Sequence, residues 1–175
     1  GQISSSSTDA VNGSQLYEAV RAVTVGANPD VYMHVNDGTS TQGAGNATTN
    51  LGKANEKGGA IGNYAIAGGV NAAASGENSI AIGRMSNATA NWGVALGYQS
   101  RNNAGSSIAI GSYAEVSKKN SIAIGSADFT TSTPSSPLPT GGTVVNGEFS
   151  IALAAGAQIS GDSSIGIGRG VTIEG

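Results

Sequence analysis

Few residues of this chain carry the side chains that catalysis requires. The 175 residues include one histidine, His34, and no cysteine. Acid–base catalysis by an imidazole and a Ser-His-Asp triad would both depend on His34, yet no acidic or nucleophilic cluster surrounds it in the sequence. The lack of cysteine excludes disulfides and thiolate metal sites. We therefore expect a structural role for His34, and a protein that is not an enzyme and holds no cofactor or metal.

Three further patterns resemble ligand sites but each lacks a necessary part. Residues 45–53 suggest a phosphate loop, but the glycine spacing is wrong and Ala54 stands where a Ser or Thr would bind magnesium. Gly68-Gly69 resembles the start of a calcium-binding nonapeptide, but the Asp that would bind the ion is missing. The acidic residues that a glycosidase would pair fall at different points of the sequence repeat, namely Glu77, Glu115 and Asp162.

The composition indicates a repeat architecture of tight turns and short strands. Glycine supplies 28 of the 175 residues, while charged residues make up 11% and aromatic residues 5%. Glycine does not recur at every third position, which excludes collagen. A net charge of −3 together with recurrent Ile and Val argues against disorder. No basic stripe is present, so we expect no nucleic-acid partner.

A five-residue string recurs with a step of 14. Ser79-Ile80-Ala81-Ile82-Gly83 has copies whose first apolar residue stands at 94, 108 and 122, and a degenerate copy begins at Ile66. Two later copies begin at Ile151 and Ile165; the 29 residues from Ile122 to Ile151 equal two steps plus one residue. Two strands and two turns per repeat form one coil of a parallel β-solenoid. The first and third positions, nearly always apolar, are predicted to form the core of the roll: Ile80, Ile82, Val94, Leu96, Ile108, Ile110, Ile122, Ile124, Ile151, Leu153, Ile165 and Ile167.

The second position of the repeat is almost always alanine. A solvated strand face would carry polar residues there, so the alanine column suggests close approach of another surface. Another copy of the same chain is the simplest candidate, since most soluble oligomers are symmetric. The alternative is that alanine merely fills a tight coil. The predicted contact residues are Ala81, Ala95, Ala109, Ala123 and Ala152.

The segments outside the repeat have simpler predicted roles. Residues 9–24 are the one helical stretch, which Thr8 or Asp9 would cap. Residues 26–63 form a Gly/Asn-rich connector with one strand at 31–35, and residues 126–149 interrupt the repeat as an exposed loop that returns through Val144-Val145. The helix has the 4-then-3 spacing of a coiled-coil seam, which adds three residues to the predicted contacts between copies: Leu16, Val20 and Val23.

Several large side chains fall outside the apolar columns. Exposed Trp, Tyr and Arg are typical of binding hot spots, although scattered surface residues would look the same. The candidates for ligand contact are Trp92, Tyr98, Tyr113, Arg84 and Arg101.

Two motifs resemble a known family. The string Asn-Ser-Ile-Ala-Ile-Gly at 78–83, echoed at 120–125, resembles the head repeat of YadA-like trimeric autotransporter adhesins. Asp-Ala-Val-Asn-Gly-Ser-Gln-Leu at 9–16 is similar to the neck motif of that family, and Tyr-Met-His-Val-Asn at 32–36 to the lead-in of its heads. The resemblance implies a left-handed parallel β-roll that packs as a homotrimer. Residues 1–25 would then be a neck-like segment with a short coiled-coil helix, 26–63 the connector, and 64–175 the head with its inserted loop at 126–149.

The resemblance also implies a place and a function. The head would lie on the surface of a Gram-negative bacterium, and a region not present in this sequence would anchor the parent chain in the outer membrane. Its partner would be a host extracellular-matrix protein or cell-surface receptor. In the best-known arrangement the neck follows the head, whereas here it precedes the head, which suggests a longer chain with several alternating modules. The alternative function is a structural spacer that presents another binding domain. The family has no fixed binding motif to carry over.

Overall fold

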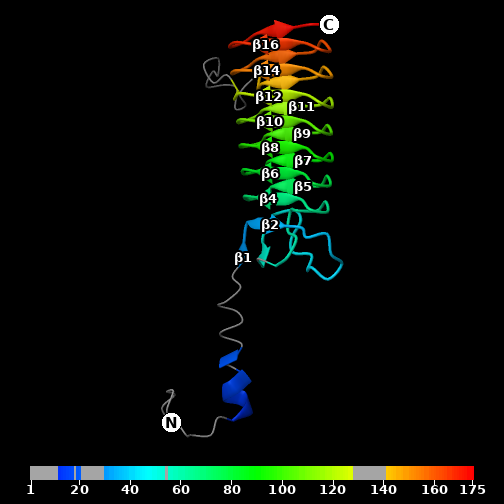
Figure 1. Cartoon of the computed structure of the whole chain (residues 1–175). Helices are drawn as coiled ribbons and strands as arrows, with labels where there is room; N and C mark the ends of the chain where they lie inside the picture. The colour runs from blue at the N-terminus through cyan, green and yellow to red at the C-terminus, as the bar shows by residue number, and fades with distance from the viewer. Residues whose placement is uncertain (1–11, 18, 21–29, 54, 128–140) are drawn as a thin grey trace, which may run out of the picture.

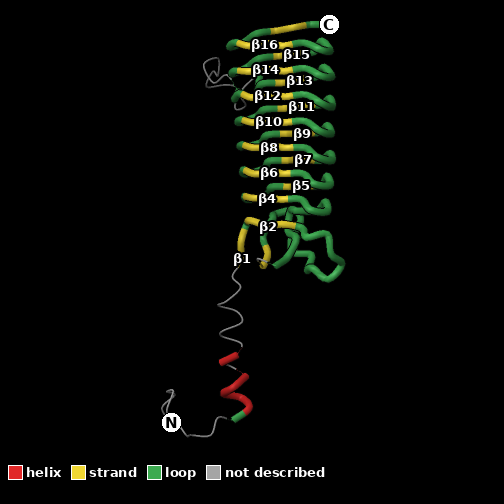
Figure 2. Tube along the Cα trace, in the orientation of Figure 1, coloured by secondary structure: helices red, strands yellow, loops and turns green. Residues whose placement is uncertain are grey.

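Each 14-residue repeat folds into one coil, and the coils stack into a narrow rod (Figure 1). The computed structural model describes residues 12–17, 19–20, 30–53, 55–127 and 141–175. Each coil contributes a three-residue strand to one sheet and a two-residue strand to a second sheet, with turns between them (Figure 2). This architecture confirms the predicted all-β parallel solenoid.

The first sheet brings equivalent repeat positions side by side. Ile80 pairs with Val94 and Val94 with Ile108, as the step of 14 requires. Its parallel strands are β4 (Ile66–Gly68), β6 (Ile80–Ile82), β8 (Val94–Leu96), β10 (Ile108–Ile110), β12 (Ile122–Ile124), β14 (Ile151–Leu153) and β16 (Ile165–Ile167). At the N-terminal end, β2 (Met33–Val35) pairs with β4 in the antiparallel direction.

The second sheet is parallel throughout and has seven strands. These are β5 (Ala73–Ala74), β7 (Asn87–Ala88), β9 (Arg101–Asn102), β11 (Glu115–Val116), β13 (Val144–Val145), β15 (Gln158–Ile159) and β17 (Thr172–Ile173). A separate antiparallel pair joins β1 (Asp30–Val31) to β3 (Gly52–Lys53). The predicted strand at 31–35 is therefore divided between β1 and β2.

The interruption of the repeat enlarges one coil. β12 pairs directly with β14, and Ile122 lies beside Ile151. The 29 residues from Ile122 to Ile151 therefore belong to one coil, which holds 15 residues (29 − 14) beyond the repeat. The chain rejoins the second sheet at β13, which is the return point indicated by the sequence.

The interior of the roll is lined by alanine, which reverses one prediction. The alanines at the second position of the repeat have no exposed surface, so they lie inside one roll and cannot contact another copy: Ala81, Ala95, Ala109, Ala123 and Ala152. The residues predicted as the core lie on the outside, half-buried or exposed. Alternation shows which residues share a face but not which face points inwards.

The reason for this orientation is the narrow space between the two sheets. Gly166 stands at the second position of β16, and the buried Ile159 lies in β15, the strand of the second sheet that comes directly before β16 in the chain. A Cβ atom added to Gly166 would lie 2.4 Å from Cδ1 of Ile159. A large side chain from one sheet is thus matched by a smaller one from the other, and an Ile at every second position would overfill the roll.

Glycine is required where the first strand ends. Gly83, Gly97 and Gly111 have φ of 129°, 130° and 126°, as the sequence predicted for the fourth position. A Cβ atom on Gly83 would lie 2.4 Å from the carbonyl oxygen of Gly97 in the next coil. The turn therefore admits no side chain without moving a neighbouring backbone.

Buried polar side chains bind the coils to one another. The backbone N–H of Ser121 donates to Oγ of Ser107 at 3.2 Å, and that of Ser150 donates to Oγ of Ser121 at 3.2 Å. Asn102 lies inside the second sheet, where its amide donates to the carbonyl of Val94 and accepts from the N–H of Ala104. These polar groups are therefore satisfied within the core.

The described part of the N-terminal helix begins after Asn12. Residues 13–17, 19 and 20 are helical. Oδ1 of Asn12 accepts from the N–H of Gln15 at 3.0 Å, and Oε1 of Gln15 accepts from the N–H of Asn12 at 3.1 Å. This is a reciprocal capping box. Asn12 is thus the cap of this helix, and the expected caps Thr8 and Asp9 lie outside the described residues.

Candidate interaction face

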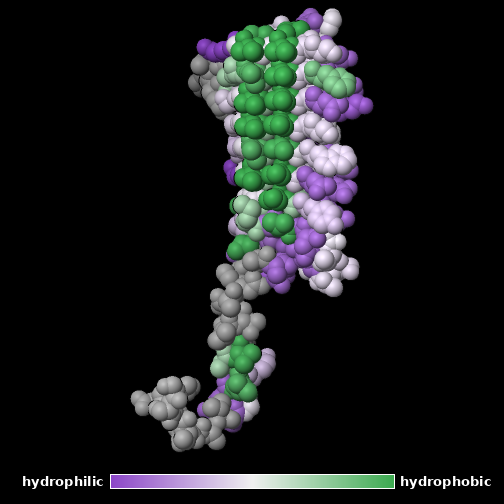
Figure 3. Space-filling view, viewed as in Figure 1, coloured by the Kyte–Doolittle hydropathy of each residue, from purple (hydrophilic) through white to green (hydrophobic). Residues whose placement is uncertain are grey.

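The outer surface of the first sheet is a continuous apolar face. It consists of the side chains at repeat positions one and three, which form two parallel columns along the rod (Figure 3). Ile82 and Ile124 expose 39% and 40% of their surface, and most of the others are half-buried. Strands about 4.8 Å apart make this face roughly 30 Å long. With the roughly 10 Å width of a three-residue strand, the face covers about 300–400 Å². This is the size of the largest apolar patch on a typical monomer, and such a patch is often functional.

β2 extends the apolar face by one further strand. Met33 and Val35 lie beside Gly68 and Ile66, and expose 53% and 49% of their surface. A Cβ atom on Gly68 would lie 2.8 Å from Cε of Met33, so the methionine fills the place that the glycine leaves open. The sequence did not assign Met33 to this face, because only the antiparallel pairing brings it there.

The outer surface of the second sheet has the opposite character. Its outward side chains are mostly polar or charged, and we call it the polar face: Ala73, Asn87, Arg101, Glu115, Val144, Gln158 and Thr172. Arg101 and Glu115 lie in neighbouring strands. The rod therefore has one outer face suited to water and one suited to burial.

The candidates for ligand contact are distributed over three places. Arg84, Tyr98 and Tyr113 gather on one edge of the rod, where the guanidinium of Arg84 lies 5.3 Å from the ring of Tyr98. The Tyr98 and Tyr113 rings meet edge to face with centroids 5.3 Å apart. Partial desolvation, followed by the hydrogen bond with Tyr98, raises the pKa of Tyr113, while Arg84 opposes the rise. Trp92 lies on the other edge, and Arg101 lies on the polar face.

Trp92 has two companions that sequence reasoning missed. Tyr64 and Phe149 occupy the same repeat position, and the three side chains expose 58%, 59% and 59% of their surface. All three residues have a left-handed backbone, with φ between 54° and 60°. The shared repeat position was the signal that could have identified them, since they lie 28 residues before and 57 residues after Trp92.

The chemistry-bearing residues of the connector are engaged in structural contacts. His34 is buried beneath the first coil, and its Nδ1 lies 2.9 Å from Oδ1 of Asn50. The Asn50 amide donates to the carbonyls of Tyr32 and Gly69. In the suggested phosphate loop, Lys53 forms an ion pair with Asp30 at 2.7 Å. Among the described residues, no group of three His, Asp or Glu side chains is arranged to hold a metal.

The helix presents part of its predicted seam to solvent. Leu16 and Val20 expose 58% and 55% of their surface, and Val23 lies outside the described residues. Within the part of the chain that the structure describes, no helix is long and apolar enough to cross a membrane.

Two family models match the chain. A model described as the coiled stalk of trimeric autotransporter adhesin matches residues 1–32. A model described as the YadA head domain repeat matches residues 60–84, 74–100 and 103–127, which are coils of the solenoid. No curated protein matches the chain.

Proposed function

Because this chain belongs to the YadA-like trimeric autotransporter adhesins, we propose that it forms a homotrimeric head region that attaches a bacterium to host cells or extracellular matrix. The observation that carries the proposal is the apolar face, which one copy of the chain leaves uncovered. The proposed place is the outer surface of a Gram-negative cell, with the parent chain anchored in the outer membrane elsewhere in its length. The proposed activity is binding, not catalysis.

Three copies would bury the apolar face around a common axis. Covering about 350 Å² of apolar surface contributes on the order of 9 kcal/mol per protomer before the costs of association. The interior alanines supply little apolar volume of their own, so the trimer would provide a core that one roll lacks. This assigns the contact between copies to the isoleucine columns and not to the alanine column of the earlier prediction.

The polar face would then point outwards on all three sides of the trimer. It would be the surface available to a host protein, with Arg101 and Glu115 among its charged residues. Three identical copies of one weak site increase apparent affinity when the ligand is repetitive, as a matrix fibre is. The rigid stack would hold these sites at fixed distances from one another.

Binding of the purified trimer to immobilised collagen, fibronectin and laminin, and to host cells, tests the proposed attachment. We expect saturable binding to at least one of these surfaces by the trimer. A control with Arg101→Ser and Glu115→Ser on the polar face asks whether this surface makes the contact. A trimer that binds none of them would contradict attachment by this region and favour the spacer function instead.

A further inference from the structure

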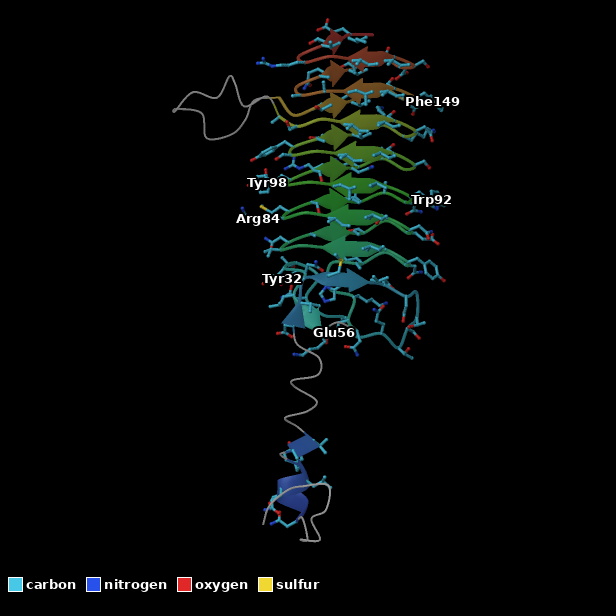
Figure 4. All side chains as sticks on the ribbon, turned by 60° about the vertical axis from the view of Figure 1, so that its left-hand side comes forward. Tyr32, Glu56, Arg84, Trp92, Tyr98 and Phe149 are labelled. Carbon is cyan, nitrogen blue, oxygen red and sulfur yellow. The ribbon has the colours of Figure 1, made fainter. Side chains whose placement is uncertain are left out.

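The apolar face is bordered on each side by a column of turn residues. The aromatic edge precedes the first strand of every coil and consists of Tyr64, Asn78, Trp92, Ser106, Asn120, Phe149 and Ser163. The arginine edge follows that strand and consists of Val70, Arg84, Tyr98, Ser112, Ser126, Ala155 and Arg169. Figure 4 shows Trp92 and Phe149 projecting on one side of the rod and Arg84 and Tyr98 on the other.

The two edges match each other row by row. A row is the pair of edge residues that belongs to one coil. Where the aromatic edge has a ring, the arginine edge has an aromatic or apolar residue: Tyr64 with Val70, Trp92 with Tyr98, and Phe149 with Ala155. In the other four rows, the residue on the aromatic edge is polar and so is its partner on the arginine edge: Asn78 with Arg84, Ser106 with Ser112, Asn120 with Ser126, and Ser163 with Arg169.

Contacts within one roll do not explain this agreement. Trp92 and Tyr98 lie on opposite sides of the strand β8 and project away from each other (Figure 4). Tyr98 instead contacts Arg84 and Tyr113, which are on its own side. In a closed ring of identical copies, however, one edge of each copy meets the other edge of the next copy at the same height.

We propose that the aromatic edge of each protomer packs against the arginine edge of its neighbour and sets the three rolls at equal height. The proposal rests on the trimer proposed above. At the centre of each seam, Trp92 packs on Tyr98 and Arg84 of the next protomer. Ring–ring and cation–π contacts of this kind stabilise partly desolvated interfaces. The outer rows exclude water from the apolar face, as the rim of an interface does.

The backbone at the aromatic edge supports a role for these rings. Trp92 and Phe149 have φ of 56° and 54°, a conformation that is unfavourable for bulky residues and that glycine or asparagine adopts more easily. Asn78 and Asn120 occupy the same position in other coils. Ser106 and Ser163 have the same backbone, so the turn imposes this conformation in every coil. A bulky ring in place of asparagine at such a turn is explained by a compensating contact, and the neighbouring protomer supplies that contact.

Pairs of introduced cysteines test the seam, because the chain has no cysteine of its own. Trp92→Cys with Tyr98→Cys, and separately Ser106→Cys with Ser112→Cys, place thiols in matched rows. Trp92→Cys with Ser126→Cys places them two coils apart and is the control. With a short bis-maleimide reagent, we expect the matched pairs to give covalent dimers and trimers on a denaturing gel, and the control pair to give several-fold less.

The fluorescence of the parent protein gives an independent measurement, since Trp92 is its one tryptophan. In the trimer we expect blue-shifted emission and quenching by acrylamide several-fold weaker than in the denatured chain. The molar mass from light scattering separates a failure of the proposed trimer from a failure of the proposed seam. A trimer with solvent-like Trp92 emission and no preference for matched cysteine rows would overturn the seam alone, whereas a monomeric mass would overturn the proposed trimer.

Discussion

Replacing Ile110 by alanine removes part of the apolar face without touching the interior of the roll. Ile110 lies at the third position of β10 and is half-buried in its own protomer. Fully burying an Ile side chain contributes about 1.5–3 kcal/mol. Covering the part that one roll leaves exposed therefore contributes about 1 kcal/mol per protomer, or about 3 kcal/mol per trimer.

That loss predicts a measurable change in assembly. Because 1.4 kcal/mol corresponds to a factor of ten, the Ile110→Ala trimer should have an association constant about 100-fold lower than the parent. Sedimentation equilibrium at increasing urea concentration measures this, and circular dichroism checks that the solenoid persists. The matched control is Glu115→Ala, which truncates a side chain on the polar face in the second strand of the same coil. If Glu115→Ala weakened the trimer and Ile110→Ala did not, the assignment of the two faces would be refuted.

Three further predictions concern the stability of the roll itself. Ala109→Leu should destabilise the fold by about 1–3 kcal/mol or more, because Ala109 is fully buried between the sheets; a urea midpoint equal to that of the parent would contradict the alanine core. Gly83→Ala should lower the melting temperature, since its Cβ would lie 2.4 Å from the carbonyl oxygen of Gly97, whereas Gly105→Ala, whose nearest contact is 3.4 Å, is the milder control. Asn50→Ala should cost about 1–3 kcal/mol by leaving buried backbone groups unpaired; hydrogen exchange should then accelerate in β2 and β4, and unchanged protection there would count against this role of Asn50.

The repeat made most of the fold predictable from the sequence. Seven copies of the repeat predicted the coil length, the strand positions and the glycine at the turn, because a solenoid repeats its local conformation in every coil. The turn at Gly83 needs a positive φ and a space without a side chain, and both requirements are visible in the residue type. The sequence predicts an interruption of the repeat at 126–149, and the pairing of Ile122 with Ile151 shows that the 29 residues between them belong to one turn of the rod.

Alternation alone does not show which face of the first-sheet strands points into the roll. Ile80 and Ala81 point to opposite sides in either orientation, and the larger residue was assigned to the core by analogy with ordinary globular proteins. The small distance between the sheets decides which residues face the interior. It is visible at Gly166, which has no side chain where the side chain of Ile159 enters from the other sheet. Ile159 and Gly166 lie in strands of different sheets, and their match becomes informative only when it is known that these strands face each other across the roll.

The candidate surface residues were predictable in part. Trp92 and the Arg84–Tyr98–Tyr113 group were identified by residue type, but their separation onto two edges required the structure. Met33 joins the apolar face through the antiparallel pairing of β2 with β4, which no repeat position indicates. Non-local pairing of this kind is the information that the repeat itself does not contain.

The molar mass in solution tests most directly whether the apolar face joins three copies of the chain. Light scattering should give about three times the chain mass of 17.0 kDa for the parent protein. For Ile110→Glu, which would place three charges at the centre of the buried face, we expect 17.0 kDa with the β-signal retained. A parent protein of 17.0 kDa, or an Ile110→Glu trimer as stable as the parent, would contradict the account.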